Sequence, residues 1–120
     1  MSAARVLRTL RQKRLREVGE AGQARLFAAS ARVEGEGLRA EIAVRYLVGA
    51  GIGELAAPTS LHAIARAVDD TVQLSDASAV EPANALAGVP EVMTDPEARA
   101  AFAGALEALR LVRSCLDHAP

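Results

Sequence analysis

Apolar residues recur at helical spacing in five stretches of the chain, with polar residues at the intervening positions. The predicted helices cover residues 3–16, 23–29, 38–50, 60–69 and a stretch from 94 onward. Gly19 and Gly22 break or offset the chain between the first two, and the second brings Leu26 and Phe27 to the core. In the third, the spacing places on the buried side Leu38, Ile42, Leu47 and either Tyr46 or Val44.

The stretch that begins at Thr94 carries the strongest helix signal. Pro96 stands in the first turn, and Glu97 follows Thr94 by three residues, which is typical of a capped helix start. Apolar residues then recur at spacings of 3 and 4, namely Phe102, Leu106, Leu109, Val112 and Leu116. This stripe predicts a long C-terminal helix that buries these five side chains.

Short apolar runs between the helices predict strands at 31–34, 54–57 and 72–74. Because these strands alternate with helices, we expect a parallel sheet with right-handed crossovers. The run 75–90 has no period and predicts a long connection, after which 92–93 could add a short fourth strand. The expected fold is a small three-layer α/β domain over 31–120 with a short parallel sheet of three or four strands, preceded by a basic helical arm over 1–30.

The turn after the first strand has the order of a phosphate-binding element. The strand runs into Gly35-Glu36-Gly37 and then into the helix from Leu38, so the turn's backbone N–H groups would face a polyphosphate, and Ala40 stands where a third glycine is common. Glu36, however, places a carboxylate between the two glycines. One such charge about 4 Å from a phosphate costs roughly 1 to 4 kcal/mol. A tight turn that packs helix on strand is therefore favoured over an intact nucleotide site.

Charge is distributed unevenly along the chain. The net charge is −1, but the first 16 residues carry +6 and the remainder −7. Such a basic helix could be a solvated face or bind nucleic acid or anionic membrane, but no aromatic residue is interleaved with its bases, so neither nucleic acid nor membrane is expected as a partner. Cys115 is the one cysteine, which excludes an internal disulfide or a CxxC metal pair, and no apolar run reaches 18 residues. We therefore expect a cytoplasmic protein without a metal site.

Two segments carry a resemblance to a known family. Arg8-Thr9-Leu10-Arg11-Gln12, followed by Gly19-Glu20-Ala21-Gly22-Gln23, is similar to the opening of the HesA/MoeB/ThiF family, the bacterial relatives of ubiquitin-activating enzymes. There the pattern is Arg-x-x-Arg-Gln and then Gly-x-x-Gly-Gln. The likeness continues from Val33 to Leu55 through the glycine turn, the helix after it and Ala50-Gly51-Ile52-Gly53. It covers about 48 residues without a gap, and 103–111 resembles the family's late Ala/Gly/Leu-rich helix more weakly.

The resemblance implies ATP-dependent adenylation of a ubiquitin-like or sulfur-carrier protein by a Rossmann-like domain that works as a dimer. Several of the family's functional positions are altered here: the ribose-binding acid falls at Thr59, and no residue matches the phosphate-binding stretch, the magnesium-binding Asp, the zinc cysteines or the nucleophilic cysteine. The family's N-terminal arginine, which reaches into the partner subunit's ATP site, is matched by Arg11, with Arg8 and Gln12 beside it.

These observations lead to two expectations of function. The first is a degenerate, non-catalytic dimerisation partner or regulatory subunit without a cofactor or catalytic residue, in which Arg8, Arg11 and Gln12 act in trans and Gly35, Glu36, Gly37 and Ala40 are a vestigial nucleotide turn. Its partner would be a second copy or an intact ThiF-type homologue, together with a ubiquitin-like or sulfur-carrier protein, and would cover hydrophobic faces left by the missing half of the sheet. The alternative is a minimal active adenylyltransferase that uses ATP and Mg²⁺.

Overall fold

Three short parallel strands form the sheet in a computed structural model of the chain, which describes residues 19–117. The strands are β1 (Ser30–Arg32), β2 (Glu54–Ala56) and β3 (Gln73–Ser75), in the order β1-β2-β3. Ala31 is paired with Leu55, and Leu55 with Leu74. The predicted α/β class and parallel sheet are thus confirmed. The fourth strand expected at 92–93 is wrong, since that segment forms a turn in which the Met93 N–H donates to Pro90 O at 3.1 Å.

Helices cover one face of this sheet. Helix α3 (Leu38–Ala50) joins β1 to β2, while a short 3-10 turn, η2 (Thr59–Leu61), and α4 (His62–Val68) join β2 to β3. Ala31 and Leu55 point into the core shared with these helices. The alternate strand positions are exposed and polar, namely Ser30, Arg32, Glu54, Gln73 and Ser75. The expectation of three layers and of a hydrophobic sheet face awaiting a partner is therefore wrong for the described residues, because the uncovered face is polar.

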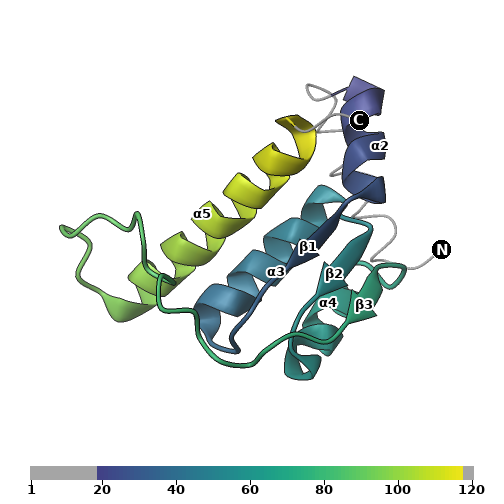
Figure 1. Cartoon of the computed structure of the whole chain (residues 1–120). Coiled ribbons are helices and arrows are strands. Elements are labelled where there is room, and N and C mark those ends of the chain that lie inside the picture. The colour runs from purple at the N-terminus through teal and green to yellow at the C-terminus, as the bar shows by residue number, and fades with distance from the viewer. Residues whose placement is uncertain (1–18, 118–120) are drawn as a thin grey trace.

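The long C-terminal helix, α5 (Pro96–Asp117), runs beside α3 (Figure 1). The two helices approach closely at Gly104, where an added Cβ would collide with Arg39 O and the Ile42 side chain. Helix α2 (Gly19–Ala28) lies at the far end of α5, and Arg25 Nη1 donates to Leu116 O at 3.3 Å. Leu26 of α2 is buried in the common core.

The close approach at Gly104 determines which face of α5 is buried. The helix turns its small residues Ala103, Gly104 and Ala108 inward, because only small side chains fit against the α3 backbone. Phe102 and Leu109 of the predicted core stripe are consequently 38 % and 53 % exposed. The burial prediction for these two residues is wrong, whereas the predicted helix itself is confirmed.

Three smaller expectations are also corrected. Phe27, predicted in the core, is 60 % exposed, and Gly22, predicted to break a helix, is buried within α2. In α3, Val44 takes the buried position and Tyr46 is exposed, which decides an open alternative, while Leu38 is partly exposed. The first turn of α5 is capped by Asp95, whose Oδ2 accepts the Ala98 N–H at 3.0 Å.

The connection 76–95 is irregular, as expected, but it is held in place at two points. The Gly35 N–H donates to Ser78 O at 2.9 Å, and Glu81 is bound by Arg39. Among residues 19–117, no helix is long and apolar enough to cross a membrane. The predicted helix over 3–16 and the residues Arg8, Arg11 and Gln12 lie outside the described residues.

Candidate functional site

The glycine turn lies at the carboxyl edge of the parallel sheet, where ligands bind in open α/β folds. Gly35 has φ +92, in the left-handed region that favours glycine, and Gly37 is the N-cap of α3. No side chain caps this helix start, and the first intrahelical bond runs from the Glu41 N–H to Gly37 O at 3.0 Å. The predicted tight turn between strand and helix is therefore present, with Ala40 buried one turn into α3.

The space against this turn is filled by a buried cluster around Arg39. Its side chain is 2 % exposed, and its Nε donates to Glu81 Oε1 at 2.5 Å. Nη1 donates to both carboxylate oxygens of Glu107 at 2.8 Å, and Nη2 donates to Glu34 O. A Cβ added at Gly35 would collide with the Glu81 carboxylate. One guanidinium thus joins the end of β1, the connection 76–95 and α5.

Burial and charge act in opposite directions within this cluster. Burial disfavours the charge of Arg39, but the hydrogen bond to Glu81 and the charges of Glu107 and Glu81 outweigh it, so the pKa of Arg39 is raised. Burial raises the pKa of Glu107, and Arg39 only partly offsets this because Glu81 and Glu34 add further negative charge. The guanidinium is therefore committed to two carboxylates and is not available to a phosphate.

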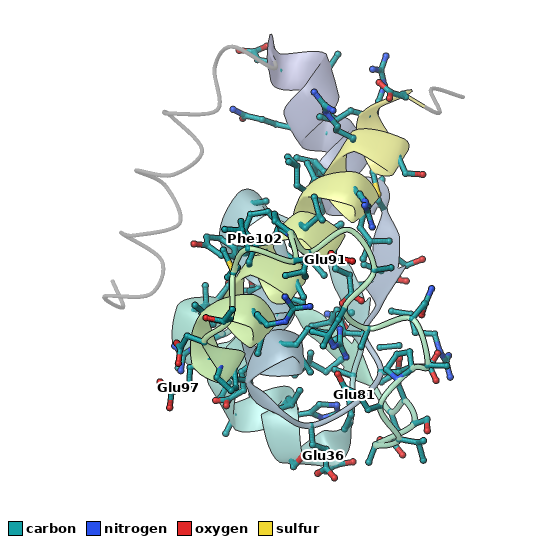
Figure 2. The ribbon with its side chains drawn as sticks, turned by 90° about the vertical axis from the view of Figure 1, so that its left-hand side faces the viewer. Glu36, Glu81, Glu91, Glu97 and Phe102 are labelled. Atoms are coloured by element: carbon teal, nitrogen blue, oxygen red, sulfur yellow. The ribbon has the colours of Figure 1, made fainter. Side chains whose placement is uncertain are left out.

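Glu36 lies at the mouth of the turn. It is exposed, and its Oε2 accepts a hydrogen bond from Ser60 Oγ at 2.5 Å, so its carboxylate bridges toward the start of η2. Figure 2 shows Glu36 and Glu81 at the same end of the molecule. A hollow of about 430 Å³ next to the turn is lined by Gly37, Leu38, Glu81, Pro82 and Leu86, among others. Acidic and apolar groups thus surround the place that an anion would need.

The neighbouring strand ends are joined by internal hydrogen bonds. Thr59, where the resemblance places a ribose-binding acid, donates through Oγ1 to Asp76 Oδ1 at 3.1 Å. His62 Nε2 lies 2.9 Å from Ala57 O and 3.0 Å from Ser75 O, so its N–H joins the ends of β2 and β3. No group of three or more His, Cys, Asp or Glu side chains in residues 19–117 is placed to hold a metal ion. Cys115 is half-buried and packs against the core, as predicted.

Sequence reasoning identified the turn but missed the groups that fill it. Asp76 could have been found, because it directly follows β3 and so lies at the same sheet edge as Glu36. Arg39 also carried a signal, since a basic residue in the first turn of a helix opposes the helix dipole unless acids compensate it. Glu81 had none, because it lies in a segment without hydrophobic periodicity.

Comparison with known proteins adds no further likeness. The chain matches no protein-family model, no curated protein and no solved structure. The interpretation of the site therefore depends on its own geometry and on the motif resemblance described above.

Proposed function

We propose that this chain is a reduced Rossmann-like domain of the HesA/MoeB/ThiF type that does not adenylate on its own. It acts as a non-catalytic dimerisation partner or regulatory subunit of an ATP-dependent enzyme that activates a ubiquitin-like or sulfur-carrier protein. The order of the strands and the glycine turn at the carboxyl edge of the sheet support the Rossmann-like part of this proposal.

One observation carries the non-catalytic part. The carboxylates of Glu36 and Glu81 stand at the turn whose N–H groups would have to bind a polyphosphate, and the nearby Arg39 is committed to Glu81 and Glu107. Each carboxylate about 4 Å from a phosphate costs roughly 1 to 4 kcal/mol, so nucleotide binding is strongly weakened.

The contribution to a partner would come from the N-terminal segment. Arg11, with Arg8 and Gln12, matches the family's arginine that acts in the partner subunit's ATP site. An arginine supplied in trans stabilises charge on a reacting phosphate even when the nucleotide site of its own chain is inactive.

ATP–pyrophosphate exchange tests this function. The full-length chain is assayed alone with a carrier protein, and then mixed with an intact ThiF-type homologue. We expect no exchange by the chain alone and a faster exchange by the mixture, which Arg11→Ala removes. Arg14→Ala, in the same basic segment but outside the motif, is the matched control and should leave the stimulation unchanged. Exchange by the chain alone that is lost in Arg11→Ala would overturn the non-catalytic proposal.

A second candidate function is a minimal ATP- and Mg²⁺-dependent adenylyltransferase. The observation that favours it is the start of α3, where no side chain caps the helix and its first backbone N–H groups remain oriented for an anion. A calorimetric titration of the chain with Mg²⁺ and ATP separates the two functions, because only the active enzyme requires tight binding.

A further inference from the structure

The outer side of α5 is an uncharged apolar stripe between one acid and one base. Its residues are Ala98, Ala101, Phe102, Ala105, Leu109 and Val112. Next to it, Tyr46 of α3 is 58 % exposed, and the two helices enclose an apolar groove of about 300 Å³ lined by Tyr46, Ala105, Leu109 and Val112, among others. Contiguous apolar surface of this kind marks a protein–protein contact.

The charges at the two ends of this stripe have opposite sign. Asp95 caps the start of α5, and Arg113 is exposed near its end. They are 18 positions apart, which is five turns of about 3.6 residues, so both lie on the same side of the helix. Phe102 and Leu109, one and two heptads after Asp95, lie on that side between them.

Such a surface is complementary to itself when it is turned around. In an isologous contact, each residue of one copy meets the residue that is symmetrically placed in the other. A two-fold axis near Ala105, midway along the stripe, would place Phe102 against the partner copy's Leu109 position and Asp95 near its Arg113 position. Antiparallel helices also oppose their macrodipoles.

We propose that a second copy of this chain packs its α5 antiparallel on α5, with the two-fold axis near Ala105. Helix α5 has 22 residues and is thus about 33 Å long, and the α3–α5 pair is roughly 20 Å wide. The resulting footprint is on the scale of about 800 Å² per partner that stable interfaces bury. The contact rests on α5 and its neighbour α3 alone and goes beyond the proposed function, because it assigns the surface through which copies pair (Figure 2).

Light scattering after size-exclusion chromatography of the full chain is the first test. We expect a dimer at about 100 µM, which Leu109→Asp converts to a monomer. Leu86→Asp is the matched control, because Leu86 is also an exposed leucine, at 47 %, but lies in the connection 76–95. It should leave the dimer intact. A monomeric parent chain, or a dimer that survives Leu109→Asp, overturns the proposal.

The register is tested by charge neutralisation. Asp95→Asn keeps an N-capping side chain and Arg113→Gln keeps a polar one, and each should weaken the dimer by about threefold to tenfold. The double variant should be no weaker than either single variant, because the second change removes a charge whose partner is already absent. Independent, multiplying losses would overturn the antiparallel register.

A thiol at the axis gives a direct readout. In a Cys115→Ala background, Ala105→Cys should form a disulfide-linked dimer under mild oxidation, whereas Ala83→Cys, exposed in the connection 76–95, should not. Equal cross-linking of both variants overturns the proposal. A monomer whose introduced thiol at 105 resists alkylation overturns it as well, since another segment, such as residues 1–18, then covers the stripe. None of these measurements requires nucleotide or a companion enzyme, so their failure is distinct from failure of the proposed function.

Discussion

The guanidinium of Arg39 binds both carboxylate oxygens of Glu107, each at 2.8 Å, and so attaches α5 to the first turn of α3. Replacing Arg39 with Met should lower the free energy of unfolding by about 2 to 4 kcal/mol, because Glu107 would remain partly buried without its cation. Urea denaturation at pH 7 measures the loss. Arg45→Met, on the exposed side of the same helix, is the control and should change stability by less than about 0.5 kcal/mol. Equal effects of the two substitutions would contradict this role of Arg39.

The raised pKa of Glu107 predicts a pH dependence of stability. Because burial raises this pKa in the folded state above its usual value of 4.5, the contribution of Glu107 to stability is fully present below pH 4.5 and is lost as the pH rises through the folded-state pKa. The unfolding free energy of the parent chain minus that of Glu107→Gln should therefore decrease from about pH 4 to pH 7. Denaturation curves across this range measure the difference.

The exposed Glu97, on the same helix, supplies the control for this pH series. Glu97→Gln should change stability by less than about 0.5 kcal/mol throughout. If the difference between the parent chain and Glu107→Gln grows as the pH rises, Arg39 rather than burial dominates the environment of Glu107.

Gly35 and Gly37 provide a matched pair within one turn. Gly35→Ala should cost about 1 to 2 kcal/mol or more, because φ is +92 and the new Cβ would meet the Glu81 carboxylate. Gly37 has φ −76 and open space around its missing Cβ, so Gly37→Ala should be tolerated with a loss below about 1 kcal/mol. Thermal or urea unfolding of the two variants measures the contrast. An equal cost at both positions would mean that Glu81 does not lie against Gly35.

The carboxylate at the mouth of the turn is predicted to oppose nucleotide binding. Glu36→Gln should raise the affinity for Mg²⁺-ATP at least about fivefold, since it removes a repulsion worth roughly 1 kcal/mol or more. Calorimetry or a fluorescent nucleotide measures the change. Glu91→Gln is the control, because Glu91 is an exposed acid far from Glu36 (Figure 2). If Glu36→Gln binds no better than Glu91→Gln, the acid is not what prevents binding.

The sequence predicted the elements of this fold more closely than their contacts. The bounds of α3 match the prediction at both ends, because Gly37 and Gly51 flank a continuous helical period, and Gly51 adopts φ +106 as a C-cap. The buried face of α5 was not predictable from its large residues, since Gly104 and its alanines determine the approach to α3. Helical periodicity alone cannot distinguish an apolar stripe that faces the core from one that faces outward.

The candidate site was predictable only in its local part. Residues 35–37 stand next to one another in the chain, and their turn chemistry can be inferred directly. The groups that fill the turn come from elsewhere: Glu81 and Glu107 lie 42 and 68 residues from Arg39. Such pairings depend on how the connection 76–95 and α5 return to α3, and no local pattern encodes this path.

These long separations have a consequence for the order of folding. The local contacts of α3 can form early, but the arginine's partners can assemble only after two long loops have closed, which is entropically slow. The connection 76–95 should thus gain its structure late and together with the docking of the last helix. Native-state hydrogen exchange would then register the Gly35 amide and the first turns of that helix opening as a single cooperative unit.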